Sequence, residues 1–403
     1  MFLITIKKIG QDFKISSRKL GLFYFLWHTS PMEKSIDRTL MNKNCAILIP
    51  TLNRPDFVIR QLNYYASLNC PYTLYYADSS NQENAERIKN EIKKLENKLD
   101  VVYLPSPAGD VMKSFVQLIS SAKEKYVTFL GDDDYWVPDT LNECVEFLEK
   151  NPDYKAAAGK AITFKTEDNT AFSRIKKIHD YPRYSIEDNT ALERLFNYLG
   201  PKSSVGSILV SVLRKDQLLE TYEKTLVIKD YPIRSEVLIN ALIIIAGKYK
   251  ILDRLGFAHQ LHDRHIYDGG NAPSGDFYDW FTNENWSSSY NILKDRVVAA
   301  LVAKDNTSEE KARQVFKKSM WFYFNQCLRG SYNRYVDTLN PPQPTKKSLR
   351  TKIATRLPFL KKLYNKFVVP RLEKDKLSYK VINSNSKYHK DFKPVVESLT
   401  KKY

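Results

Sequence analysis

The stretch Thr128-Phe-Leu-Gly-Asp-Asp-Asp-Tyr-Trp136 joins a short apolar run to three consecutive carboxylates. Tyr126 to Leu130 is rich in β-branched and aromatic residues, which predicts a buried strand, and the following glycine lets the chain turn. Ligands of open α/β sheets bind at the carboxyl ends of strands, where these acids would lie. In an extended chain Asp132 and Asp134 share one face. Two such oxygens suit Mg²⁺ or Mn²⁺, whereas one Asp capping the next helix is the structural alternative.

Apolar runs and amphipathic segments alternate ahead of this stretch. Cys45 to Pro50 is continuously apolar, as expected of a strand that helices cover on both faces. Further strands are expected at 72–77 and 101–104, and helices at 56–67, 84–99 and 111–122. Four alternations of strand and helix in about 90 residues predict a right-handed, mostly parallel α/β sheet.

Three of the expected strands end in polar loops, at Thr51 to Arg54, Asp78 to Ser80 and Asp132 to Asp134. Because parallel strands point the same way, these loops should line one rim of the sheet. The first loop, Pro50 to Pro55, contains no glycine. This composition argues against a dinucleotide-dependent dehydrogenase and against a P-loop ATPase.

The same three loops resemble the inverting nucleotide-sugar glycosyltransferases of family 2. The matching motifs are Ile49-Pro-Thr-Leu-Asn-Arg54, Asp78-Ser-Ser80 and Phe129-Leu-Gly-Asp-Asp-Asp-Tyr135. Their order and spacing carry the resemblance, which covers roughly residues 43 to 270. It implies a GT-A fold, a Rossmann-like and mostly parallel sheet flanked by helices, with the acidic motif known as DxD.

The resemblance also assigns residues to the donor, a nucleoside diphosphate sugar. Asp78 would contact the base, and the rest of the donor-binding set is Pro50, Thr51, Arg54, Asp132 and Asp133. The residues themselves leave alternatives open. Asp78 could equally close its strand as an Asx turn, and a lone loop Arg is usually solvated.

Asp134 is implied to be the metal ligand of that family, for Mn²⁺ or Mg²⁺. Three histidines cluster in Phe257-Ala-His-Gln-Leu-His-Asp-Arg-His265, where many relatives carry Tyr-Arg-x-His. His262 matches the last position of that pattern and is assigned to the metal or diphosphate, ahead of His259 and His265. An imidazole can complete a shell begun by carboxylates, although a loop His is more often polar surface.

Asp230 in Lys229-Asp-Tyr-Pro232 precedes a helix expected at 233–246. In the resembled family, an acid at such a helix start is the general base, usually within a Glu-Asp pair. Asp230 would be the catalytic residue here, and Glu236 is the reserve candidate. The structural alternative is that Asp230 simply caps the helix.

The later chain predicts a modular organisation. Strands are expected at 156–164, 207–213 and 249–252, a polar connection at 169–185, and helices at 138–149 and 191–199. The expected domains are an N-terminal extension at 1–41, a GT-A domain at 42–270 (nucleotide-binding half 42–165, acceptor half 166–270), a helical addition at 271–340 and a basic amphipathic tail at 341–403.

The chain of 403 residues carries 63 Lys and Arg against 46 Asp and Glu, a net charge of +17. An anionic partner is therefore expected. Residues 346–372 alternate apolar and basic positions at helical spacing, which predicts peripheral contact with an anionic membrane; docking of this helix on the protein is the alternative. No nucleic-acid motif is present.

No apolar run reaches the ~20 residues of a spanning helix. The four cysteines, Cys45, Cys70, Cys144 and Cys327, are too far apart to indicate a disulfide framework or a zinc site. We therefore expect a cytoplasmic protein associated peripherally with the inner face of the plasma membrane.

Together these patterns predict a metal-dependent inverting glycosyltransferase of polysaccharide biosynthesis. It would move a sugar from a nucleoside diphosphate sugar to a hydroxyl of a lipid-linked or cell-surface glycan. The alternatives are a nucleotidyltransferase with the same carboxylate–metal site and a non-enzymatic basic protein that binds membrane or nucleic acid. Deletion of 341–403 should leave an enzyme active on its donor.

Overall fold

The fold is described from a computed structural model, which describes residues 44–107, 111–168, 170–200, 208–230, 233–262, 281–339 and 374–401. The chain divides into Met1–Ile36 and Asp37–Tyr403, and all described residues belong to the second unit. The predicted extension at 1–41 and the predicted amphipathic segment at 346–372 lie outside the described residues.

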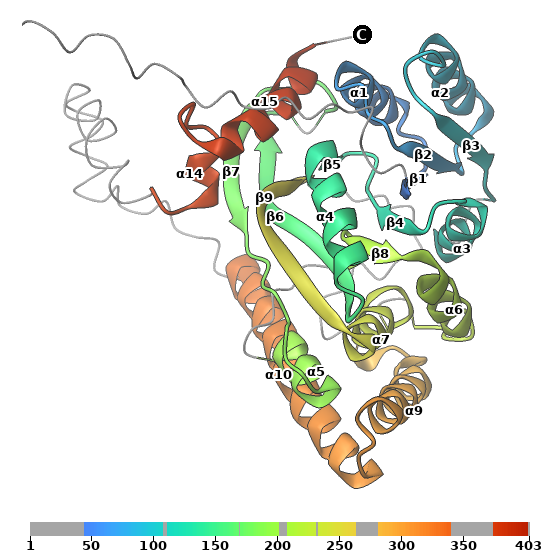
Figure 1. The fold of residues 1–403 in the computed structure, drawn as a ribbon, viewed down its shortest axis with the longest axis vertical. Helices are drawn as coiled ribbons and strands as arrows, with labels where there is room; N and C mark the ends of the chain where they lie inside the picture. Colours follow the sequence, from blue (N-terminus) through green and yellow to red (C-terminus); the bar gives the residue numbers. More distant parts are fainter. Residues whose placement is uncertain are drawn as a thin grey trace, which may run out of the picture. The chain divides into compact units, whose positions relative to one another are not determined.

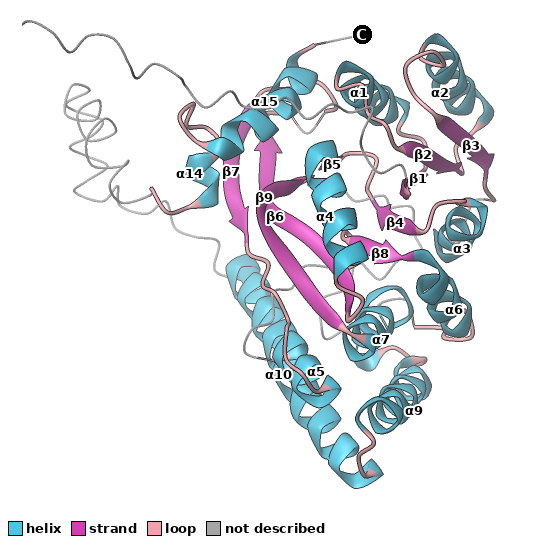
Figure 2. Ribbon diagram, in the orientation of Figure 1, coloured by secondary structure: helices cyan, strands magenta, loops and turns pink. Residues whose placement is uncertain are grey.

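Nine strands in the described residues form a single sheet in the order β3-β2-β1-β4-β8-β6-β9-β5, with β7 paired to β6 beside this path (Figure 2). The strands are β1 Cys45–Thr51, β2 Thr73–Asp78, β3 Val101–Pro105, β4 Tyr126–Phe129, β5 Tyr135–Trp136, β6 Tyr154–Thr166, β7 Ile175–Tyr181, β8 Val212–Arg214 and β9 Lys248–Gln260.

The first four strands in the chain pair in parallel. β1 lies between β2 and β4, and β3 pairs with β2. Cys45 to Ile49 of β1 are fully buried, as its unbroken apolar sequence predicts. This arrangement directs the carboxyl ends of the strands, and the polar loops that follow them, to one edge of the sheet.

The other strands make the sheet mixed. β8 pairs antiparallel with both β4 and β6, and β5 pairs antiparallel with β9. β6 and β9 form the longest ladder, which is parallel, so most paired residues lie in parallel ladders and the predicted α/β fold class is confirmed. Strand β9 is longer than the predicted 249–252, whereas β8 is shorter than the predicted 207–213.

Helices cover both faces of the sheet. Figure 1 shows α4 crossing β6 and β9, against which it packs, and α5 beside α10. Their bounds are α1 Pro55–Ser67, α2 Gln82–Lys94, α3 Val111–Ser121, α4 Pro138–Lys150, α5 Ala191–Leu199, α6 Lys215–Thr225, α7 Leu238–Ala246, α9 Trp286–Asp305, α10 Glu309–Leu339, α14 Leu377–Lys380 and α15 Lys387–Thr400. A π-helical turn, Ile233–Val237, leads into α7.

Two elements of the predicted acceptor half, 166–270, were not expected from the sequence. Strand β7 occupies part of the predicted polar connection at 169–185; it pairs only with β6 and exposes most of its polar side chains, so it lacks the apolar alternation of a half-buried strand. Helix α6 begins at the residue after β8 ends, without the loop that usually separates two elements.

The last part of the predicted tail packs against the sheet domain. In α15, the buried residues Tyr388, Phe392, Val395 and Leu399 recur at three- and four-residue steps and face α1 and β9. Ser398 Oγ also donates a hydrogen bond of 2.8 Å to the Tyr135 hydroxyl. Residues 374–401 therefore belong to the packed domain rather than to a separate tail, and deletion of 341–403 would expose part of the core.

No helix among the described residues has both the length and the apolar character needed to cross a bilayer.

Candidate active site

The ends of β1 and β2 bring predicted donor residues side by side. Thr51 is the register partner of Asp78, and Pro50 pairs with Ala77 one position earlier. Thr51 Oγ1 donates a hydrogen bond of 2.7 Å to Asp132 Oδ2, which joins this edge to the acidic stretch after β4. Strand ends that are distant in sequence thus form one rim.

Asp78 is buried and its two carboxylate oxygens accept bonds from the protein. Oδ1 accepts the backbone N–H of Ser80 at 2.8 Å, and Oδ2 accepts the Tyr103 hydroxyl at 2.8 Å. The first bond closes an Asx turn, the structural alternative for this residue. Asp78 thus shapes the rim, and its contact with a base stays a prediction.

Arg54 forms a fork between two of the three acids. Its Nη1 lies 2.7 Å from Asp132 Oδ1 and its Nη2 lies 2.9 Å from Asp133 Oδ2. The guanidinium also lies over the ring of Phe57, 4.1 Å from the ring centre. Such a planar, bidentate cation is suited to oxyanions, and Arg54 is held in place rather than solvated.

Asp134 contacts strand β9 rather than the residue predicted to share its metal. His259 Nδ1 lies 2.8 and 3.0 Å from its two carboxylate oxygens, and the backbone N–H of Gln260 donates to Oδ1 at 2.9 Å. Pairing of β5 with β9 creates this contact. His262 Nε2 instead lies 3.1 Å from Asp133 Oδ2. His265 lies outside the described residues.

Two fully buried polar residues of α1 hold the backbone of the acidic stretch. Gln61 Nε2 donates to the carbonyls of Gly131 and Asp134, at 2.8 and 2.9 Å, and Arg60 Nη2 donates to the carbonyl of Asp133 at 2.8 Å. Sequence reasoning missed both, although a polar pair on the face of α1 that turns toward the sheet was an available signal.

Gly131 lets the carboxylates fold back over the turn. A Cβ at this position would lie 2.7 Å from Asp133 Oδ1 and 3.1 Å from Asp134 Oδ2. A side chain here would therefore displace the acids that form the site.

Burial and nearby charges shift the pKa values of the three acids in different directions. Burial raises the pKa of Asp132 to about 7, against the opposing effect of Arg54. Burial acts in the same direction on Asp133, but His262 and Arg54 outweigh it and hold the pKa of Asp133 below its usual range. Burial also raises the pKa of Asp134.

Burial lowers the pKa of His259, but Asp134 and Asp133 outweigh this effect and raise it to about 9. His259 is therefore protonated at neutral pH and forms an ion pair with Asp134. The cluster thus holds Asp132, an acid that titrates near neutrality, beside the ionised Asp133 and the protonated His259.

The donor set fits a divalent cation only in part. Within the described ranges, no group of three His, Cys, Asp or Glu side chains converges as a metal site. Asp134 offers an oxygen and His259, once it has lost its proton, a nitrogen at the same point, which are donor types that Mn²⁺ accepts. Two protein ligands are compatible with a cation that takes most of its remaining ligands from water and substrate phosphates.

The predicted base stands at a helix start on the acceptor side. The Asp230 side chain is buried, and its Oδ1 accepts the N–H of Ile233 at 2.9 Å, the contact of a capping residue. The N–H of Asp230 donates to Ser289 Oγ of α9 at 3.1 Å. Glu236 lies in the π-helical turn with its side chain exposed.

Comparison with known proteins finds a family match over part of the chain. Residues 46–205 match the model of glycosyl transferase family 2. This part of the chain is a family 2 glycosyltransferase domain. The matched region runs from β1 past α5 and contains Thr51, Arg54, Asp78 and the acid triplet, so the predicted resemblance is confirmed for this part of the glycosyltransferase. A non-enzymatic binding protein and a nucleotidyltransferase are not supported.

No curated protein matches the sequence. Three crystal structures of S. aureus TarS are similar in fold. The 1–349 fragment is 14% identical, with a TM-score of 0.42. The match covers 70% of this chain and 72% of the fragment. Its complex with UDP-GlcNAc is 15% identical, with a TM-score of 0.43 and the same coverage. The longer TarS chain is 14% identical, with a TM-score of 0.40, and is covered to 43%. Similarity of this size identifies neither donor nor acceptor.

Proposed function

We propose that this glycosyltransferase moves a sugar from a nucleoside diphosphate sugar to a hydroxyl of a lipid-linked or cell-surface glycan, with inversion at the anomeric carbon. The cluster of Arg54, the three acids and two histidines at the strand ends supports this proposal, because it gathers a phosphate-binding fork and metal-type donors at the ligand edge of an α/β sheet.

The Arg54 fork is the first contact proposed for the diphosphate. In the free protein its two nitrogens bind Asp132 and Asp133. A diphosphate offers the same spacing of anionic oxygens, so Arg54 can exchange a carboxylate for phosphate. Protonation of Asp132, whose pKa is raised to about 7, lowers the cost of that exchange near neutral pH.

Asp134 is the residue proposed to hold the divalent cation, and His259 joins it once the cation displaces the imidazole proton. A bound Mn²⁺ or Mg²⁺ would neutralise charge that develops on the departing nucleoside diphosphate. His262 is then assigned to orienting Asp133, which it contacts, rather than to sharing the cation with Asp134.

Asp230 is proposed to take the proton of the acceptor hydroxyl while its oxygen attacks the anomeric carbon from the face opposite the diphosphate. The bond from Ile233 N–H to Asp230 Oδ1 orients the carboxylate. Glu236, six residues after Asp230 at the same helix start, is the comparison residue for this role.

The proposal keeps the predicted peripheral contact of 346–372 with the inner face of the plasma membrane, supported by the basic and apolar alternation of that sequence. A polyprenyl-type or surface glycan acceptor would be met at such a membrane. This part of the proposal stands separately from the chemistry of the donor site.

A donor screen tests the proposed function. Thermal unfolding is measured with UDP, GDP and other nucleoside diphosphates and their sugars, each with Mn²⁺ and with EDTA. We expect one base to raise the unfolding temperature by several degrees with Mn²⁺, as ligand linkage requires. An Asp56→Asn variant, altered at an exposed pair with Arg87, should respond like the natural chain. Absence of any response to nucleotides would contradict the proposal.

A further inference from the structure

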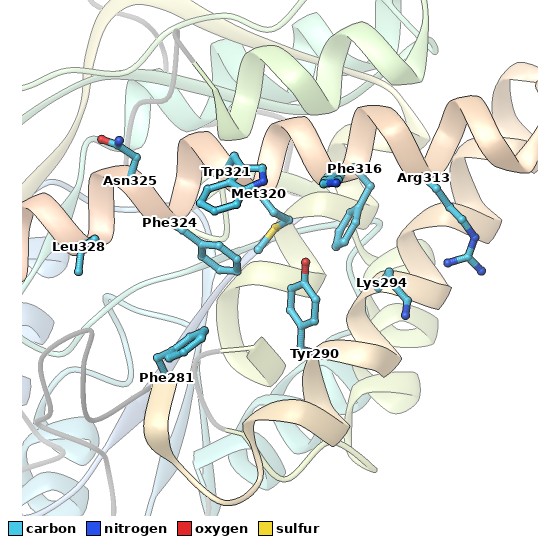
Figure 3. A pocket seen from close by; sticks show the side chains of 11 residues that line it. Phe281, Tyr290, Lys294, Arg313, Phe316, Met320, Trp321, Phe324, Asn325 and Leu328 are labelled. Carbon is cyan, nitrogen blue, oxygen red and sulfur yellow. The ribbon is translucent and has the colours of Figure 1, made fainter.

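An apolar cavity of about 800 Å³ lies between α9 and α10 and shares no residue with the acid cluster (Figure 3). Its floor is made by the buried side chains of Phe316 and Met320. Tyr290 from α9 and Phe324 from α10 line it and contact each other, with ring centres 5.9 Å apart, and Phe281 closes one side. The volume falls in the range of sites that hold small molecules, about 300–1,000 Å³.

The wall contributed by α10 is one face of that helix. Its lining positions, from 313 to 328, recur at three- and four-residue steps. The outer part of this face has no covering element among the described residues, since Trp321 is 65% exposed and Leu328 is 55% exposed. Exposed apolar groups beside a cavity with a polar rim mark interaction sites.

The charged residues that line the cavity, Lys294, Arg313 and Lys317, are all basic. Figure 3 shows Lys294 and Arg313 together at one end, with Leu328 at the other. Arg313 is paired with Glu309 at 2.7 Å, and Lys294 lies 3.8 Å from Asp295. Lys317 makes no ion pair within the described part of the chain. The groove is therefore apolar along its length and cationic at one end.

We propose that this groove binds an anionic phospholipid, with an acyl chain along the aromatic floor and the phosphate at Lys317 and Lys294. An acyl chain matches the apolar lining, and the phosphate is opposite in charge to the three basic residues that line the groove. Trp321 at the mouth is the residue type that prefers a membrane–water interface. The site would dock the α9–α10 pair on a membrane, independently of the donor chemistry and of residues 346–372.

A second copy of this chain fits the groove less well. In a two-fold dimer the same patch faces itself, so the basic ends would approach one another or lie unpaired at the interface. A phospholipid bilayer instead presents many phosphates at the level of the apolar boundary. The charge of the rim therefore favours lipid over self-association.

Vesicle co-sedimentation tests the proposal. The full chain is mixed with vesicles of phosphatidylcholine alone or with phosphatidylglycerol added, at fixed ionic strength. Lys317→Glu and Leu328→Glu alter exposed side chains and should each weaken binding to the anionic vesicles about tenfold. Lys311→Glu makes the same charge change on α10 outside the groove and should change binding by less than threefold.

Two further arms keep the outcomes distinct. A variant with Lys361, Lys362 and Lys366 changed to Glu tests the predicted 346–372 contact. If this variant loses binding while Lys317→Glu and Leu328→Glu retain it, the groove proposal is overturned. Monomeric dodecyl phosphate should quench Trp fluorescence of the natural chain but not of Leu328→Glu, and inorganic phosphate alone should not.

Sedimentation velocity completes the test. We expect the natural chain and Leu328→Glu to have the same oligomeric state. If the natural chain forms a dimer that Leu328→Glu dissociates, and neither lipid probe binds, the groove is a self-association surface and the lipid proposal is wrong. Circular dichroism melts of both groove variants should match the natural chain, because both altered side chains are exposed.

Discussion

The predicted donor half and the predicted acceptor half of this glycosyltransferase differ in how their polar residues are held. At the donor rim, Arg54 and the acids 132–134 are locked by short contacts between neighbouring strand ends and β9. On the acceptor side, Asp230 meets Ser289 from 59 residues away, and Glu236 is exposed. The donor site is built by the sheet itself, whereas the acceptor side depends on helices added later in the chain.

This difference explains why the donor half carries motifs that can be recognised in the sequence. Parallel strands gather their carboxyl ends at one edge, so a few loop residues are enough to specify a phosphate and metal site. The proposed acceptor side is built from helix starts and from segments distant in the chain, such as Asp230 and Ser289, whose juxtaposition no short motif encodes. Variants in each half should therefore fail in different ways.

The largest effect is expected at the donor rim. Asp134→Asn should lower the rate of sugar transfer about 10⁴-fold, because it removes the carboxylate proposed to hold the cation opposite the diphosphate. The measurement is release of nucleoside diphosphate at saturating donor with Mn²⁺. Asp56→Asn is the matched control and should retain full activity. If Asp134→Asn releases nucleoside diphosphate within tenfold of the natural rate, Asp134 has no part in the mechanism.

On the acceptor side the effect should fall on turnover alone. Asp230→Asn should lower kcat about 10³-fold, since general base catalysis contributes about 10²–10⁴-fold, while donor affinity stays unchanged. Glu236→Gln should stay within tenfold of the natural rate. The opposite ranking of the two variants in steady-state kinetics would transfer the base role to Glu236.

A third change tests whether the final helices belong to the domain that carries both halves. Phe392→Ala should lower the free energy of unfolding by about 3 kcal/mol, because the ring is buried between α15 and the sheet. Val396→Ala alters the exposed side of the same helix and should cost less than about 0.5 kcal/mol in urea unfolding. Equal, small decreases in the free energy of unfolding for both variants would show that residues 374–401 are a separate tail.

The ion pair that joins β9 to the donor rim predicts a pH dependence. Because the pKa of His259 is raised to about 9 in the folded protein, its contribution is complete below its ordinary value near 6.5 and is lost as pH rises through 9. Relative to His259→Gln in EDTA, the natural chain should be more stable by on the order of 2 kcal/mol near pH 6, where His259 is protonated and Asp134 is still ionised. A stability difference that stays constant across this pH window would contradict the ion pair.

Much of the donor half could be predicted from the sequence. Strand β1 was readable from its continuous apolar run, and the rim from the polar residues that end β1, β2 and β4. Arg60 and Gln61 were missed because buried polar residues show their role only once their carbonyl partners are known. Asp134 contacts His259 because β5 pairs with β9. The two contacting residues lie 125 positions apart in the chain.

The acceptor half and the C-terminus were less predictable. Strand β7 has the polar composition of an edge, and β8 and α6 join without a loop, so local patterns did not separate them. The apolar stripe of α15 was present in the sequence but lay behind a strongly basic segment, which favoured its interpretation as tail. Burial of that stripe depends on α1 and β9, far away in the chain.

The most direct test is a calorimetric titration of the preferred nucleoside diphosphate into the natural chain, in Mn²⁺ and in EDTA, repeated with Asp134→Asn. The strand-end cluster predicts tight binding only for the natural chain in Mn²⁺, with affinity at least about 100-fold weaker in EDTA and in the variant. Equal affinity in all three titrations would show that the nucleotide binds without the cluster and would contradict the account.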